Sequence, residues 1–112
     1  MIERDRIVSF ADEKVKEAFE TLEKENPEMH KFIKRAIGDL RRDPFFGTAV
    51  QKSLIPKIYI KKYGIDNLWK YDLTGAWRLM YSVAGDKIRI VSIILEWLNH
   101  KEYERRFGYK SR

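Results

Sequence analysis

The chain has 112 residues, the length of one small domain with a single hydrophobic core, and we expect one domain over residues 1–112. Apolar residues make up 44% of the sequence and charged residues 36%, which is too apolar a mixture for a disordered segment. The absence of cysteine excludes disulfides, cysteine-ligated zinc and a thiol nucleophile, and it favours a cytoplasmic protein. No apolar run approaches the roughly 20 residues of a membrane span, so we expect neither a span nor a secretory leader.

The net charge of +6 is concentrated in one half of the chain. Residues 1–56 contain 11 basic and 11 acidic side chains, whereas residues 57–112 contain 12 basic and 6 acidic ones. A one-sided basic excess is typical of a protein that binds an anionic partner, either a phosphate backbone or an acidic protein. The alternative is a solvated surface that keeps the protein soluble.

The first half predicts a short strand over Arg6–Phe10 followed by two helices. Asp12 is a suitable N-cap for the first helix, and Asn26-Pro27 supplies a cap and a first-turn proline for the second. Asp43-Pro44 ends the second helix, because the residue before proline avoids the helical region. The connection between the helices is short, which predicts an antiparallel hairpin. The apolar stripes are Val15, Ala18, Phe19 and Leu22 in the first helix, and Met29, Ile33, Ala36, Ile37 and Leu40 in the second.

The second half changes to a hydrophobic period of two. Ile55-Pro56 opens a possible helical turn that Gly64 closes, and three strands follow, with turns at Thr74-Gly75 and Gly85-Asp86. The predicted strands are Leu68–Leu73, Ala76–Ala84 and Lys87–Trp97. The order predicts an α+β fold in which an N-terminal strand and a two-helix antiparallel hairpin precede an antiparallel β-meander, with the hairpin packed on one sheet face.

Burial considerations predict the register of the first strand pair. A two-residue turn would pair Leu73 with Ala76 and would bring Lys70 and Asp72 into the core. A three-residue loop over Thr74–Ala76 pairs Leu73 with Trp77 instead, and Gly75 can adopt the positive φ that such a loop needs. The large residues that then share the core face are Trp69, Tyr71, Leu73, Trp77, Leu79 and Tyr81.

The same register places charged residues on the opposite face. Asp72 lies directly across from Arg78, and a two-residue turn at Gly85-Asp86 would pair Ser82 with Arg89. Lys70, Arg78 and Arg89 would then form a row of cations, which is either the solvated side of a half-buried sheet or a binding groove. Apolar residues on the same face favour a groove or a surface covered by another chain; they are Met80, Val91, Ile93 and Leu95.

Residues 99–109 combine histidine, tyrosine and several cations, and we expect them to return to the sheet edge. His100 can transfer a proton, arginine and lysine can stabilise a developing phosphorane, and Tyr103 can stack on a base or act as a weak acid. These groups suit metal-free RNA cleavage by the neighbouring 2′-hydroxyl, although a capped chain end would have the same composition. His30 falls on the polar side of its helix and receives no role. The sequence contains no metal-ligand spacing, nucleophile elbow or glycine-rich phosphate loop, and we expect no metal and no cofactor.

The stretch Asn67-Leu-Trp-Lys-Tyr-Asp-Leu-Thr-Gly-Ala-Trp-Arg-Leu-Met-Tyr-Ser-Val83 and the later Ile-Leu-Glu-Trp-Leu-Asn-His100-Lys-Glu-Tyr-Glu-Arg-Arg-Phe107 resemble the RelE/ParE toxin superfamily of type II toxin–antitoxin systems. The motifs are specific over about the last forty residues and match only in pattern before that. The resemblance implies the α+β fold described above. It also implies a ribosome-dependent, metal-independent mRNA endoribonuclease that cuts the A-site codon by 2′-hydroxyl attack and is covered by a cognate acidic antitoxin.

The resemblance also assigns roles to residues. Arg78 matches the sheet arginine that contacts the scissile phosphate, and Lys70 lies near the family's basic strand positions. His100, Lys101 and Tyr103 occupy the region of the family's acid–base and stacking groups. Together with the charge pattern, this gives a site with Arg78, His100 and Tyr103 as catalytic residues, and with an RNA-binding set of Lys70, Arg89, Lys101, Arg105 and Arg106.

Two departures and two alternatives accompany this assignment. Asp72 stands where some RelE proteins have a second lysine, and no glutamate is clearly placed as the base that some relatives use. The ParE branch shares the fold, inhibits DNA gyrase and lacks the catalytic groups, so the alternative is a non-enzymatic gyrase inhibitor or a degenerate toxin that only binds its antitoxin. A basic RNA-binding module without catalysis is a third interpretation.

Overall fold

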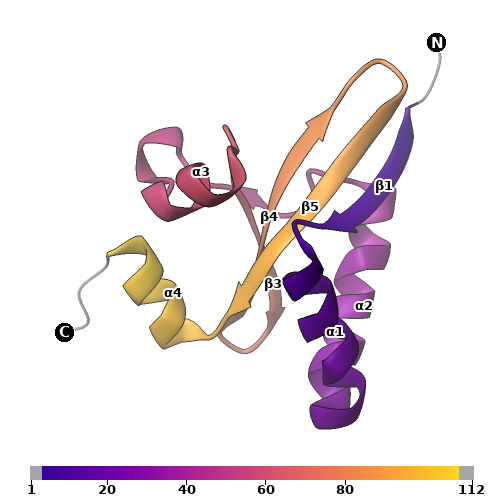
Figure 1. Cartoon of the computed structure of the whole chain (residues 1–112), viewed down its shortest axis with the longest axis vertical. Helices are drawn as coiled ribbons and strands as arrows, with labels where there is room; N and C mark the ends of the chain where they lie inside the picture. Colours follow the sequence, from indigo (N-terminus) through magenta and orange to yellow (C-terminus); the bar gives the residue numbers. More distant parts are fainter. Residues whose placement is uncertain (1–3, 109–112) are drawn as a thin grey trace.

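The computed structural model describes residues 4–108 (Figure 1). In chain order the elements are β1 (Asp5–Phe10), α1 (Glu13–Glu25), α2 (Pro27–Arg42), β2 (Thr48–Ala49), the 3₁₀ turn η1 (Lys52–Leu54), α3 (Lys57–Tyr63), β3 (Trp69–Thr74), β4 (Trp77–Gly85), β5 (Arg89–Leu98) and α4 (His100–Phe107). None of the helices within residues 4–108 has the length and hydropathy of a membrane-spanning segment.

The strands form a mixed sheet in the order β1-β5-β4-β3-β2. The predicted α+β class is confirmed, and β3, β4 and β5 pair antiparallel in sequence order. The expectation of a purely antiparallel meander is wrong, because β1 lies parallel to β5 with Ile7 opposite Val91. The chain runs from β1 through the α1–α2 hairpin to the far edge of the sheet and returns strand by strand to β5, and β1 covers what would otherwise be an open edge of β5.

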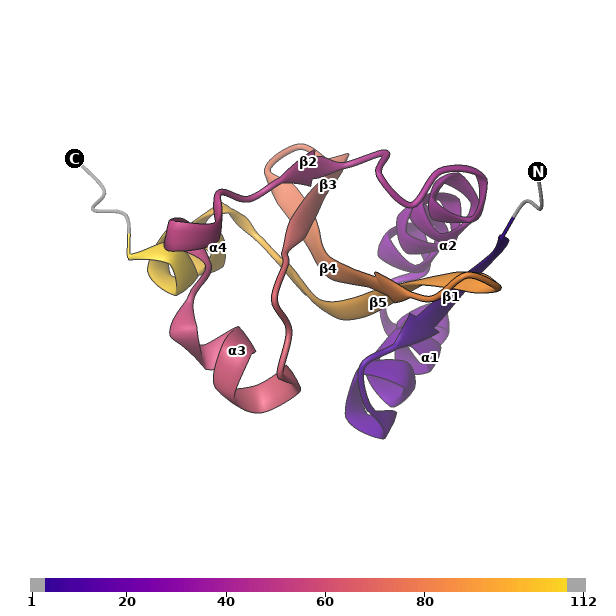
Figure 2. The ribbon, with the colours of Figure 1, turned by 90° about the horizontal axis from the view of Figure 1, so that it is seen from above.

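Helices cover both faces of the sheet, whereas the sequence predicted a helix layer on one face only. Figure 2 shows α1 and α2 on one side of the strands and α3 and α4 on the other. The first core contains Met29, Ile33, Ala36, Leu40, Tyr71, Leu73, Leu79, Tyr81 and Ile94. The second contains Ile55, Tyr59, Leu68, Met80, Leu95, Leu98 and Tyr103.

The predicted caps fix the helical hairpin. Oδ1 of Asp12 accepts a hydrogen bond from the Val15 N–H at 2.9 Å, and Oδ1 of Asn26 accepts one from the Met29 N–H at 3.2 Å. Helix α2 ends before Asp43-Pro44 as predicted and buries four residues of its stripe. Helix α1 buries none of its residues, and Ala18 is exposed rather than part of a core-facing stripe.

The β3–β4 pair has the predicted faces but a different turn. Asp72 lies opposite Arg78 and Tyr71 opposite Leu79, as expected. Thr74 pairs with Trp77, so the turn contains two residues instead of three, and a bulge between Asp72 and Thr74 keeps the charged residues out of the core. Gly75 has the predicted positive φ, 52°.

The predicted turn between β4 and β5 is wrong. Ser82 pairs with Ile93 and not with Arg89. The Asp86 carboxylate accepts hydrogen bonds from the backbone N–H groups of Ile88 and Arg89 at 2.8 and 3.0 Å, which favours a longer connection. A Cβ on residue 85 would lie only 2.6 Å from the Arg89 carbonyl oxygen, which is too close for two non-bonded atoms. The close contact of the two strands at this turn therefore requires Gly85.

A second bulge lies in β5. Tyr81 pairs with Ile94 and the preceding Met80 pairs with Glu96, which leaves Leu95 as the extra residue. Regular alternation through Ile94, Leu95 and Glu96 would direct Glu96 toward α1 and α2. The bulge instead places both Leu95 and Glu96 on the face that α3 and α4 cover.

Candidate functional site

Side chains from three elements meet at the ring of Tyr103. The Arg78 guanidinium carbon, from β4, lies 4.5 Å from the ring centroid, and Lys70 Nζ, from β3, lies 5.5 Å from it. Tyr103 itself is 7% exposed and packs on Phe107 of the same helix with 4.5 Å between ring centroids. The aromatic face attracts both cations and holds them at one place on the sheet.

Arg78 is held by the β3–β4 turn and lies across from Asp72 of β3. Its Nη1 donates to the Ala76 carbonyl at 2.7 Å, and its Nε lies 3.9 Å from Oδ1 of Asp72. Nε is buried without a hydrogen-bond partner, while the side chain as a whole is 22% exposed. Asp72 therefore lies across from Arg78 as predicted, but it accepts no hydrogen bond from Nε, and its carboxylate is mostly in water and neutralises the guanidinium weakly.

His100 lies at the start of α4, a helix that the sequence did not predict. Its Nε2 lies 2.9 Å from Oε1 of Glu104 one turn later, and its side chain is 58% exposed. The signals for α4 were present: Asn99 and Glu102 form a capping box, and Gly108 ends the helix with a positive φ of 73°. Lys101 and Arg105 are exposed on this helix, and residue 109 of the predicted segment lies outside the described residues.

Arg106 is engaged in a structural ion pair. Its Nε and Nη2 lie 3.0 and 3.1 Å from the two carboxylate oxygens of Glu96, and the Tyr59 hydroxyl donates to the same carboxylate. Burial first, and then the hydrogen bond to Glu96, raises the pKa of Tyr59 well above its ordinary value. We call Tyr59, Glu96 and Arg106 the clamp, because they join α3, β5 and α4. Sequence reasoning missed Tyr59 and Glu96.

Arg89 lies apart from the other cations. It is the first residue of β5 and pairs with Asp5 of β1, whereas Arg78 pairs with Leu98 at the other end of β5. At roughly 3.3 Å per strand residue, the two arginines are separated by about 25 Å or more. The structure brings Lys70, Arg78 and Tyr103 together but does not extend the row of cations to Arg89.

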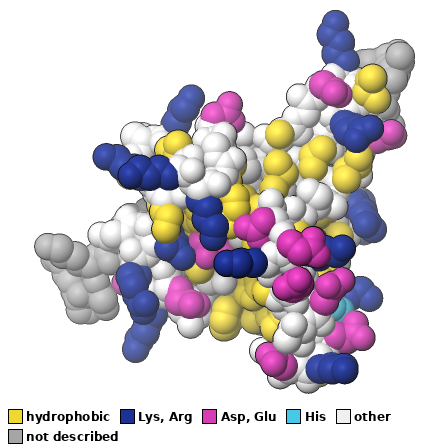
Figure 3. Space-filling model, in the orientation of Figure 1, with side chains coloured by type: hydrophobic (Ala, Val, Ile, Leu, Met, Phe, Trp, Pro, Cys, Tyr) yellow, Lys and Arg dark blue, Asp and Glu magenta, His cyan; other side chains and the backbone are white. Residues whose placement is uncertain are grey.

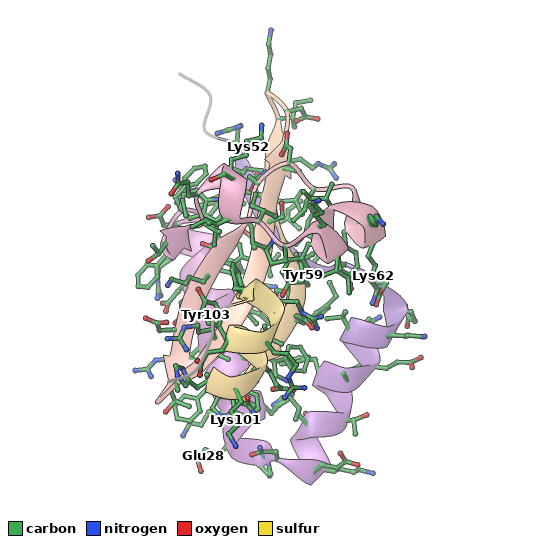
Figure 4. The ribbon with its side chains drawn as sticks, turned by 90° about the vertical axis from the view of Figure 1, so that its left-hand side faces the viewer. Glu28, Lys52, Tyr59, Lys62, Lys101 and Tyr103 are labelled. Carbon is green, nitrogen blue, oxygen red and sulfur yellow. The ribbon has the colours of Figure 1, made fainter. Side chains whose placement is uncertain are left out.

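Further cations lie on η1 and α3, on the same side of the sheet as α4 (Figure 2). Their positions are Lys52, Lys57, Lys61 and Lys62, all of them exposed. No acidic residue occurs between Asp43 and Asp66, which is the sequence signal that could have identified this basic segment. Figure 3 shows lysine and arginine gathered over α3 and α4, with acidic side chains concentrated over α1. Figure 4 looks onto the basic side, with Lys52, Lys62 and Lys101 arranged around Tyr59 and Tyr103.

The remaining part of this sheet face is apolar. Ile7 and Val91 are neighbours on β1 and β5, and Ile93 follows two residues later. Ile7 is 37% exposed, and Val91 and Ile93 are half-buried. The predicted mixture of apolar and cationic groups is therefore divided in space, with the cations near α4 and the open apolar strip near β1.

Within residues 4–108, no three histidine, aspartate or glutamate side chains gather in a group that could hold a metal ion. Comparisons of the chain with protein-family models, with curated proteins and with solved structures return no significant match.

Proposed function

We propose that the chain is the toxin of a type II toxin–antitoxin pair and acts as a ribosome-dependent, metal-independent mRNA endoribonuclease of the RelE kind. The observation that carries this proposal is the convergence of Arg78 and Lys70 on Tyr103. A rigid pair of cations on a sheet, inside a broad basic surface, suits a phosphodiester held in a longer RNA.

The proposed reaction needs no external reagent. The 2′-oxygen attacks the adjacent phosphorus, a P–O2′ bond forms and the P–O5′ bond breaks. A base takes the proton from the 2′-hydroxyl, and the 5′-oxygen gains one, which gives a 2′,3′-cyclic phosphate and a 5′-hydroxyl. Arg78 stabilises the charge on the pentacoordinate phosphorus, Lys70 holds the same phosphate, and His100, exposed and three residues before Tyr103 on α4, transfers a proton.

Two side chains act differently in this proposal from their sequence-based roles. The Tyr103 ring is almost fully covered and carries two cations, so it serves as their platform rather than as a stacking surface for a base. Arg106 is paired with Glu96 and supports α4 instead of binding phosphate. Lys101, Arg105 and the η1–α3 lysines contact the RNA backbone around the site.

The proposed partner is an acidic antitoxin. It would neutralise the basic side of the molecule, and its apolar residues would cover the strip formed by Ile7, Val91 and Ile93. Both surfaces adjoin on one face of the sheet, so one extended segment could cover them together.

A second candidate is a non-enzymatic toxin of the ParE kind or a degenerate toxin that only binds its antitoxin. The observation that favours it is the engagement of the assigned catalytic side chains within the chain. His100 is paired with Glu104, and Tyr103 is covered by Arg78 and Lys70. Such a protein would retain the basic surface for binding and would leave RNA intact.

The test is a translation reaction in which new mRNA 5′ ends are mapped after the purified chain is added. The wild type should generate cuts at A-site codons, and Arg78→Ala should reduce the cleavage rate about 10²–10³-fold, the usual effect of losing one donor to a developing anion. Arg89→Ala is the matched control, because it removes the same charge from the far end of the sheet and should change cleavage less than about threefold.

A parallel supercoiling assay with DNA gyrase separates the two candidates. Intact mRNA together with blocked supercoiling would replace the nuclease proposal by the gyrase one. Intact mRNA with normal supercoiling would leave antitoxin binding as the activity of this chain.

A further inference from the structure

A large hollow lies between α1 and α2, on the opposite side of the sheet from the Tyr103 site. Its volume is about 680 Å³, and its lining comes from these two helices alone. We call it the hairpin groove. The proposed nuclease chemistry uses none of its residues, so the groove requires a separate explanation.

The floor of the groove is apolar and incompletely covered. Phe19 and Ile37 line it, and both are only half-buried. Phe19 stacks on His30 with 4.4 Å between ring centroids. Because α1 buries none of its residues, the helical layer leaves apolar surface that a further layer could cover.

Gly38 leaves space in the groove that the chain itself does not use. It lies in the interior of α2, where glycine is the least favourable residue after proline. A Cβ at this position would meet nothing within 4 Å, so no contact inside the described chain requires glycine here. The missing side chain instead allows another backbone to approach α2 closely.

The two walls of the groove carry opposite charges. Glu20 and Glu23 lie on the α1 wall, with Lys24 beside them, and Lys34 and Arg41 lie on the α2 wall. Among the described residues, no ion pair joins the two walls across the groove apart from the contact of His30 Nε2 with Glu23 at 3.6 Å.

This distribution of charge favours a second copy of the chain as the molecule that binds in the hairpin groove. A two-fold axis along the helices places α1 of one copy over α2 of the other in antiparallel orientation. Each acidic wall then faces a basic wall, and the contact is formed twice. A peptide of one charge sign would match one wall and be repelled by the other.

We propose that the chain forms a symmetric dimer through the hairpin groove. Helix α1 is about 20 Å long and the two helices together are about 20 Å wide, so the contact covers about 400 Å² on each copy. That area lies at the low end for specific interfaces, and the dimer is therefore weak, with dissociation in the micromolar range. The Tyr103 site stays open in this dimer, because α4, which carries Tyr103, lies on the other side of the sheet (Figure 2).

The test uses two charge-reversed variants of the full chain, Glu20→Lys/Glu23→Lys and Lys34→Glu/Arg41→Glu, studied by sedimentation equilibrium at low salt. All four side chains are exposed, so the fold should tolerate the changes. Each variant alone should dimerise at least about tenfold more weakly than the wild type. The equimolar mixture should form a one-to-one heterodimer at least as tightly as the wild-type homodimer, because opposite grooves then meet.

Gly38→Leu is the second variant. It leaves the helix intact, since the space is empty within the chain, and should abolish dimerisation while the circular dichroism is unchanged and the melting temperature does not fall. A wild type that stays monomeric up to about 500 µM would overturn the proposal, and so would a dimer that neither charge reversal nor Gly38→Leu weakens. The mRNA cleavage assay is read separately, so a monomer that still cuts RNA contradicts the dimer alone.

Discussion

Arg106 and Glu96 form a two-point ion pair that fastens the last helix to the last strand. The Tyr59 hydroxyl donates a hydrogen bond to the same carboxylate, so Glu96 joins α3, β5 and α4. Helix α4 has only eight residues and would be unstable alone in water, which makes its position depend on such contacts. Glu96 therefore helps to hold α4 in place, and with it the Tyr103 ring over which Arg78 lies.

Replacement of Glu96 by alanine should destabilise the protein by about 2–3 kcal/mol, because it leaves a buried hydroxyl and a partly buried guanidinium without their acceptor. Urea unfolding measures the loss, and Glu17→Ala on the exposed face of α1 is the control. Tyr59→Phe should cost about 1 kcal/mol, since it removes one donor and leaves the ion pair. Equal stability of Glu96→Ala and the control would show that the clamp contributes nothing.

Tyr103→Phe separates the platform role from acid–base catalysis. Phenylalanine retains the aromatic face over which Arg78 and Lys70 lie, so mRNA cleavage should fall by no more than about threefold. Tyr103→Ala removes the face and should reduce cleavage about as strongly as Arg78→Ala. A large loss in the phenylalanine variant, with an unchanged melting temperature, would assign proton transfer to the Tyr103 hydroxyl.

Stability should decline at alkaline pH because of buried tyrosines. Burial raises the pKa of Tyr81 to about 12, while an unfolded tyrosine titrates near 10. The unfolded chain therefore loses its proton first. The stabilisation is complete below pH 10 and is lost as the pH rises from about 10 to about 12.

Tyr71 behaves in the same way, with a pKa raised to about 12 by burial and by its hydrogen bond to Asp39. Tyrosinate absorbance should show the late-titrating group, and Tyr81→Phe should reduce the slope of unfolding free energy against pH in this window. The variant also loses the hydrogen bond from the Tyr81 hydroxyl to the Pro44 carbonyl, so slopes rather than absolute stabilities are compared.

Two glycine-to-alanine substitutions should have opposite effects on the melting temperature. Gly38→Ala places a Cβ in empty space within a helix and should stabilise the chain by about 0.5–1 kcal/mol. Gly85→Ala places a Cβ 2.6 Å from the Arg89 carbonyl oxygen, so the β4–β5 turn must shift and stability should fall by about 1–3 kcal/mol. Thermal unfolding of both variants checks the signs, and a stabilised Gly85→Ala would contradict the turn geometry.

The parts that sequence predicted well depend on local chemistry. Asp12, Asn26-Pro27 and Asp43-Pro44 bound the first two helices through interactions within a few residues. The Asp72–Arg78 pairing followed from keeping charges out of the core, which is a strong constraint on a strand with one buried face. The capping box at Asn99 is an equally local signal for the start of α4, but the sequence prediction treated this segment only as a catalytic one.

The parts that sequence did not predict depend on distant contacts. The parallel pairing of Ile7 with Val91 joins opposite ends of the chain. The alternation of apolar and polar residues in each strand is the same whatever strand it pairs with, so it could not predict this pairing. The position of Arg89 depended on a turn length that Asp86 and Gly85 control through the backbone. Glu96 was overlooked because the residue added at Leu95 changes which face it occupies, and no composition signal marks a bulge.

The bulge at Leu95 has a consequence for changes in chain length. Before the bulge, the even-numbered side chains of β5 face α1 and α2. After it, the odd-numbered side chains face those helices, and the strand contributes residues to both cores. Deletion of Leu95 would let Glu96 follow Ile94 directly, which restores regular alternation and keeps Glu96 opposite Met80, within reach of Arg106 and Tyr59. Deletion of a residue elsewhere in β5 would instead turn every following side chain to the opposite face of the sheet.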